Sequence, residues 1–110
     1  MTVIKIKKIN NQIISVECSG HTGFANNGQD ILCAAISSLI QGCALGLLNV
    51  SNIHNAEIQK NDETGYYMIQ IPEDLSAQQR LQANTLLNTL ELCLKDLKKG
   101  YSKYIKLEVK

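Results

Sequence analysis

The stretch Asp30-Ile-Leu-Cys-Ala-Ala-Ile-Ser-Ser-Leu-Ile-Gln-Gly-Cys-Ala-Leu-Gly-Leu-Leu-Asn49 is the most apolar part of the chain and has the periodicity of an α-helix. Apolar side chains recur every three or four residues, at Ile36, Leu39, Ile40, Cys43, Leu47 and Leu48. Asp30 is a good N-cap, so we expect the helix to begin there and to end near Asn49. Further apolar residues widen its surface, which predicts that it is covered on two sides, by a sheet plus another helix or by a second subunit.

Two segments before this helix have the alternation of β-strands. They are residues 3–9 and 12–18, and Asn10-Asn11 between them tolerates the positive φ of a hairpin turn. Ile4 and Ile6 share one face of the first strand. On the second strand the same reasoning places Ile14, Val16 and Cys18 inward. The pattern predicts a half-buried antiparallel ribbon.

The elements after the helix follow the same logic. Residues 56–60 and 66–71 predict a second hairpin, and Ser76 with Gln79 forms a capping-box signature before a second helix that ends near Gly100. Residues 104–110 alternate again as a last strand. The predicted order is ββαββαβ, a single α+β domain spanning residues 1–110. We expect a mainly antiparallel sheet with two helices packed on it.

Composition restricts the class of protein. The 110 residues carry a formal net charge of +1, which gives no electrostatic footprint for nucleic-acid binding. We see no signal segment and expect no membrane span, because serine, glutamine and glycine interrupt the apolar run. Four cysteines without a secretory signal predict free thiols and a cytoplasmic protein.

A histidine and a cysteine lie at the two ends of one Gly- and Asn-rich loop, His21 to Cys33. A thiol in the first turn of a helix feels the positive end of the helix dipole, which favours the thiolate. An imidazole within reach can take the thiol proton, and this is the usual way in which a cysteine nucleophile is activated. The loop glycines and the residue after the histidine, namely Gly20, Thr22, Gly23 and Gly28, predict a flexible flap that orders over substrate.

The run Ser19-Gly20-His21, followed by Gly28-Gln-Asp-Ile-Leu-Cys-Ala-Ala-Ile-Ser37, resembles the ribosomal-processing cysteine protease family Prp. The resemblance extends to the length and element order of the chain. It implies that Cys33 is the nucleophile and His21 the general base, with Asp30 and Ser37 as supporting polar residues.

The same resemblance implies a substrate and an assembly. The family removes the N-terminal extension of a bacterial large-subunit ribosomal protein, cutting after Phe-Phe and before Ala, and it forms homodimers. An aromatic pair needs an apolar cleft. Candidate walls for that cleft are Phe24, Leu32, Tyr66, Tyr67 and Met68.

The supporting residues have more than one interpretation. Asp30 can act as the N-cap of the helix, which contributes about 1 kcal/mol to stability. It can also orient His21, as carboxylates do in other Cys-His sites. Ser37 lines the site or bonds back to the carbonyl of Cys33. We expect the oxyanion hole to come from the backbone N–H groups of Leu32 and Cys33.

The same residues are compatible with functions other than proteolysis. Cys18 and His21 have a Cys-x-x-His spacing, but only one short ligand pair is present, so we expect no metal and no cofactor. The alternatives are a non-catalytic binding module on the ribosome and a thiol hydrolase or acyltransferase that uses the same pair.

Overall fold

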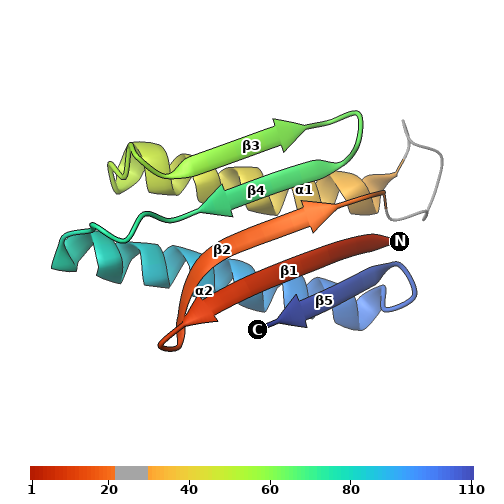
Figure 1. Ribbon diagram of the computed structural model, residues 1–110. Coiled ribbons are helices and arrows are strands. Elements are labelled where there is room, and N and C mark those ends of the chain that lie inside the picture. Colours follow the sequence, from red (N-terminus) through yellow and green to blue (C-terminus); the bar gives the residue numbers. More distant parts are fainter. Residues whose placement is uncertain (22–29) are drawn as a thin grey trace.

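The computed structural model describes residues 1–21 and 30–110 and shows one mixed sheet with two helices on one of its faces (Figure 1). The element order is the predicted ββαββαβ. In chain order the elements are β1 Thr2–Ile9, β2 Gln12–Ser19, α1 Ile31–Leu45, a π-helical turn Gly46–Val50, β3 Glu57–Asn61, β4 Tyr66–Gln70, α2 Ala77–Gly100 and β5 Ile105–Val109.

The sheet is five-stranded with the order β3-β4-β2-β1-β5. Three neighbouring pairs are antiparallel, and only β1 and β5 run parallel, with Thr2 opposite Ile105 and Ile6 opposite Val109. The long helix α2 provides the crossover that a parallel pair requires. The prediction of a mainly antiparallel sheet under two helices is confirmed.

The β1–β2 hairpin turns at Asn10 and Asn11, whose φ angles are +52° and +63°, as the sequence predicted. One inward position was predicted wrongly. A β-bulge shifts the register between Lys7 and Lys8, so that Ile13 instead of Ile14 points into the core. The extra residue reverses the alternation at the start of β2, and Val16 and Cys18 are buried as expected.

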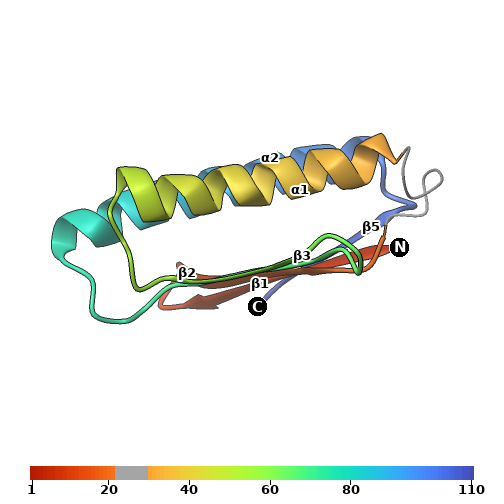
Figure 2. The same ribbon diagram turned by 90° about the horizontal axis from the view of Figure 1, so that it is seen from above.

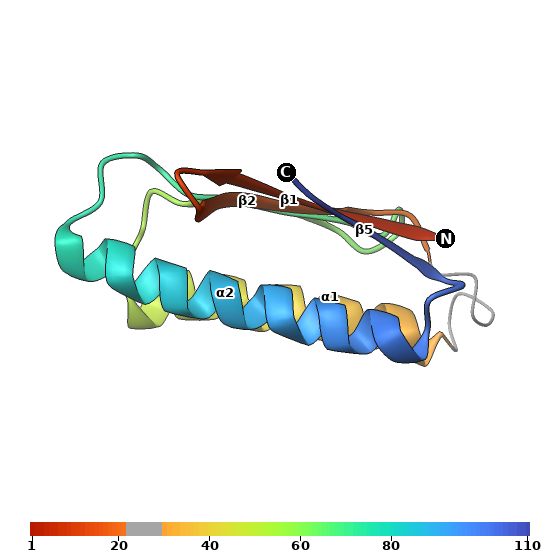
Figure 3. The same cartoon turned by 90° about the horizontal axis from the view of Figure 1, so that it is seen from below.

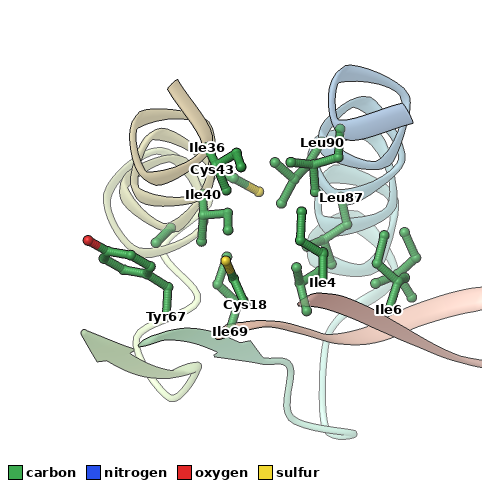
Figure 4. Packing of buried hydrophobic residues seen from close by; sticks show 14 of the residues in the cluster. Ile4, Ile6, Cys18, Ile36, Ile40, Cys43, Tyr67, Ile69, Leu87 and Leu90 are labelled. Carbon is green, nitrogen blue, oxygen red and sulfur yellow. The ribbon is translucent and has the colours of Figure 1, made fainter. Parts of the chain in front are cut away.

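The core lies between the helices and the sheet. Figure 2 shows α1 and α2 side by side over one sheet face, and Figure 3 shows the same two layers from below. Figure 4 shows Ile36 and Ile40 of α1 meeting Leu87 and Leu90 of α2 above the sheet residues. The first helix is therefore covered on two sides, by the sheet and by α2.

Both helices begin with the predicted caps. Ser76 accepts from the backbone N–H of Gln79, and the Gln79 side chain accepts from the N–H of Ser76, which completes a capping box. The first helix keeps α-helical geometry to Leu45 and continues as the π-helical turn to Val50.

The segment Ile31–Val50 is long and apolar enough to cross a membrane by length and composition alone. The expectation that no apolar run approaches a membrane span was therefore wrong on this criterion. The core helix of a folded domain passes the same test, and here the helix buries Leu32, Ile36 and Ile40 against the sheet and α2.

Candidate active site

The two residues of the predicted catalytic pair lie at the same end of the sheet. Strand β2 ends at Ser19, and Gly20, with φ of +86°, turns the chain so that His21 follows beyond the strand. Cys33 is the third residue of α1, as expected from a cap at Asp30. The Cys33 Sγ lies 3.9 Å from the His21 Nδ1. The fold thus brings together the two side chains that nucleophilic catalysis requires.

Asp30 is buried and acts on both the helix and the thiol. Its Oδ1 accepts from the backbone N–H groups of Leu32 and Cys33, each at 3.1 Å, so it is the N-cap that the sequence predicted. Its Oδ2 accepts from the Cys33 thiol at 3.2 Å. The two N–H groups expected to form the oxyanion hole therefore donate to this carboxylate, and that assignment stays a prediction.

The second nitrogen of His21 has a partner that the sequence did not indicate. The Nε2 lies 2.9 Å from the backbone carbonyl oxygen of Glu63, in the turn between β3 and β4. Forty-two residues separate the two groups in the chain, and a backbone carbonyl leaves no signature in residue type. Only the strand pairing of the hairpin could have indicated it.

A cavity of about 360 Å³ opens beside the pair and is bordered by α1, β1, β2 and the β3–β4 turn. Its walls include Thr2, Ser37, Asp62, Gly65 and Tyr67. Ser37 lies one helical turn after Cys33, and its Oγ accepts a hydrogen bond from the Gln41 amide. The prediction that Ser37 lines the site is consistent with this position.

A second hollow of about 180 Å³ lies next to the first, and Tyr67 contributes to the walls of both. It is mostly apolar, with Ile40, Ala44, Ile58 and Met68 among its walls. Of the residues that the sequence suggested as cleft walls, Tyr67 and Met68 are in place.

The remaining suggested walls have other positions. Leu32 is 2% exposed and belongs to the core, because the second helical position points toward the sheet. Within the described part of the chain, Tyr66 is not among the residues that line either hollow. Phe24 lies outside the described residues, as do Thr22, Gly23 and Gly28 of the predicted flap.

Cys33 is less buried than Cys18 and Cys43, and this difference affects the pKa values of the thiols. Burial raises the pKa of Cys18 to about 12, with a smaller contribution from the nearby Cys33, and it raises the pKa of Cys43 to about 11. Both remain thiols at neutral pH. Cys93 is only half-buried, and it borders a hollow between α1 and α2 that Cys43 also borders.

Within residues 1–21 and 30–110, no three His, Cys, Asp or Glu side chains are arranged to hold a metal ion. The polar groups around Cys33 are a carboxylate, an imidazole and backbone amides. Such groups can move a proton, and N–H donors can stabilise the negative charge that develops on a carbonyl oxygen when its carbon is attacked.

Comparison with known proteins places this geometry in a family context. The family model described as cysteine protease Prp matches residues 1–106. The ribosomal processing cysteine protease Prp of Bacillus subtilis (strain 168) is 26% identical over 89 residues, which make up 81% of this chain and 79% of that protein.

Solved structures agree on the fold. The essential ribosomal processing protease Prp from S. aureus, crystallised with a covalently linked product peptide, matches with a TM-score of 0.87 and 22% identity over 100% of both chains. Its complex with a substrate peptide matches with a TM-score of 0.82 and 21% identity, again over 100% of both chains.

Proposed function

Because the chain belongs to the cysteine protease Prp family, and is therefore a cysteine protease, we propose that it removes the N-terminal extension of a bacterial large-subunit ribosomal protein. The observation that carries the proposal is the Cys33 Sγ at 3.9 Å from the His21 Nδ1, beside an open cavity. A base at this distance from a thiol needs only a small side-chain adjustment to accept its proton.

The proposed chemistry uses these two side chains in turn. His21 takes the Cys33 proton, and the thiolate sulfur forms a bond to the scissile carbonyl carbon. The C–N bond then breaks, and His21 returns the proton to the departing amine. A water molecule, deprotonated by His21, attacks the thioester, and the sulfur leaves and regains its proton.

The proposed cleavage site is after a Phe-Phe pair and before Ala, which follows from the resemblance to the family. The apolar hollow beside the active cavity supports an aromatic side chain there, because Tyr67 and Met68 form part of its wall. Tyr67 borders both hollows, so a peptide lying across it reaches Cys33 and the apolar hollow together.

The test is mass spectrometry of a peptide that contains Phe-Phe-Ala-Ser, incubated with the wild type and with Cys33→Ala. We expect cleavage between Phe and Ala by the wild type alone. A matched peptide with Ala-Ala in place of Phe-Phe should stay intact. If the folded wild type leaves both this peptide and the intact ribosomal protein uncut, the proposed substrate is wrong.

The proposal also includes a cytoplasmic location and a homodimer. The four cysteines are free thiols, which suits a reducing compartment. Leu45 of α1, which also borders the apolar hollow, and Leu92 of α2 are 60% and 67% exposed. A two-fold contact between copies would cover such side chains.

A further inference from the structure

We propose that the β3–β4 turn is the third component of this active site, and that the backbone carbonyl of Glu63 sets the tautomer of His21. The inference rests on the proposed roles of Cys33 and His21 in peptide cleavage. It assigns to the turn what a side-chain carboxylate or amide does in other Cys-His sites.

The tautomer follows from hydrogen-bond chemistry. A carbonyl oxygen can only accept, so the contact of 2.9 Å requires the proton on the His21 Nε2. In the neutral imidazole the Nδ1 then carries the lone pair, and this is the nitrogen that lies 3.9 Å from the Cys33 Sγ. The opposite tautomer would direct an N–H at the thiol, and His21 could then not accept the thiol proton.

The same carbonyl acts later in the cycle. When His21 accepts the thiol proton it becomes an imidazolium, and its Nε2–H still donates to the Glu63 oxygen. A hydrogen bond from a charged donor is stronger than one from a neutral donor. The turn therefore stabilises the charged intermediate as well as orienting the neutral base.

The turn is held in the conformation that presents this oxygen. The Asn61 Oδ1 accepts from the backbone N–H groups of Glu63 at 3.1 Å and Thr64 at 3.3 Å. Gly65 has φ of +69° and packs on the backbone before the histidine. A Cβ at Gly65 would lie 2.6 Å from the Gly20 carbonyl oxygen and 3.4 Å from the His21 Cε1.

A second set of contacts ties the turn to the helix of the nucleophile. The Tyr67 hydroxyl donates to the Asp62 Oδ1 at 2.7 Å. Burial raises the pKa of this hydroxyl. Tyr67 and Ser37 both border the active cavity, and Ser37 is one turn from Cys33, so this wall brings α1 and the turn that positions His21 together.

Asn61→Ala tests the turn without touching the catalytic pair. The substitution removes the acceptor that holds Glu63 and Thr64, and we expect kcat/KM for the peptide to fall about 10- to 100-fold with little change in KM, a part of what a positioned base contributes. Asn61→Asp keeps an acceptor oxygen and should restore most of the activity. Thr64→Ala keeps every backbone contact of the turn and serves as the matched control.

The deciding readout is the nitrogen-15 spectrum of the histidine side chains in the free protein, recorded through a pH titration. We expect neutral His21 to carry its proton on Nε2 in the wild type, Thr64→Ala and Asn61→Asp, and to become a mixture of tautomers in Asn61→Ala. His54, which is exposed, provides an internal reference.

Two results would overturn the inference. One is a proton on Nδ1 in neutral wild-type His21, and the other is an Asn61→Ala protein whose tautomer and kcat/KM both match the wild type. The tautomer readout depends on no substrate, because the spectrum is recorded without peptide. Failure of the proposed cleavage would leave the tautomer result intact, so the two failures are distinguishable.

Discussion

At the scale of single residues, the environments of the four thiols predict an order of reactivity. Cys18 and Cys43 are buried and have raised pKa values of about 12 and about 11, so both react slowly at pH 7. Cys33 is partly exposed and has His21 beside it to accept its proton. We expect iodoacetamide to modify Cys33 first, as followed by peptide mapping over time.

The histidine provides the control for this order. His21→Ala removes the base, and alkylation of Cys33 should slow several-fold while Cys93, which is half-buried on α2, reacts at an unchanged rate. Equal rates at Cys33 with and without the imidazole would show that His21 does not activate this thiol.

A second residue-scale prediction concerns Asp30, whose carboxylate caps α1 and contacts the thiol. Asp30→Ala should lower the free energy of unfolding by about 1 kcal/mol and should also reduce kcat/KM. Ser76→Ala removes the cap of α2 and should lower the free energy of unfolding by a similar amount, while the activity stays unchanged. Thermal unfolding and peptide cleavage measure the two effects. Full activity in a destabilised Asp30→Ala would limit this residue to capping.

The sequence predicted the site unevenly, for physical reasons. Cys33 and Asp30 could be placed because an N-cap fixes the helix register within one turn. His21 could be placed because Gly20 ends the strand immediately before it. The Glu63 carbonyl could not, since its role depends on how a hairpin forty residues away packs against the strand end.

At the scale of elements, one buried carboxylate joins the sheet to the second helix. The Oε1 of Glu91, on α2, lies 3.0 Å from the Nζ of Lys8 on β1. Its Oε2 lies 2.7 Å from the Nζ of Lys95, one turn farther along α2. Burial by itself raises the pKa of Glu91, but the hydrogen bonds and charges of the two lysines outweigh it, and the pKa is lowered. The carboxylate is therefore bound in its charged form.

The contribution of Glu91 to the stability of the fold depends on pH. A lowered pKa in the folded state stabilises the fold above the ordinary value of 4.5, and the contribution disappears as the pH falls below it. Glu91→Gln should lower the free energy of unfolding at pH 7 by about 1.5 kcal/mol, the loss of hydrogen bonds to a charged group. The loss is no larger because both lysines can return to water. The difference from the wild type should shrink toward pH 3, where the wild-type carboxylate becomes protonated. Urea unfolding at the two pH values measures it.

Glu108 is the matched control, since it also contacts two lysines but at the exposed edge strand β5. Glu108→Gln should unfold like the wild type at pH 7. A Glu91→Gln protein as stable as Glu108→Gln would show that the buried carboxylate contributes nothing beyond packing.

The element order was predictable because strands and helices here have clear periods of two and of about 3.6 residues. The bulge near Lys8 was not, because an extra residue in β2 leaves the composition unchanged and only shifts which of Ile13 and Ile14 points inward. The residue at which α1 ends could not be predicted from the sequence either. No proline marks the change to π-helical geometry at Gly46, where the side chain of Leu86 packs closely.

At the scale of the whole molecule, the outer helix face gives a prediction about assembly. We expect the wild type to sediment as a dimer at micromolar concentration, because exposed leucines on α1 and α2 remain uncovered by the sheet. Leu45→Glu combined with Leu92→Glu should shift it to a monomer with an unchanged far-ultraviolet spectrum, since neither side chain is in the core. A monomeric wild type at that concentration would contradict the dimer.

The first strand begins at the rim of the active cavity. Thr2 is part of the cavity wall, and its hydroxyl donates to the Gly20 carbonyl at 3.3 Å, while the C-terminal Lys110 bonds to Ile6 and Lys8 farther along β1 (Figure 1). Any peptide fused ahead of Met1 would emerge next to Cys33. Such a tether would hold its residues near the cleft at an effective concentration in the millimolar range. An N-terminal purification tag would then act as a built-in competitor of substrate, whereas a tag after Lys110 would leave the cleft open.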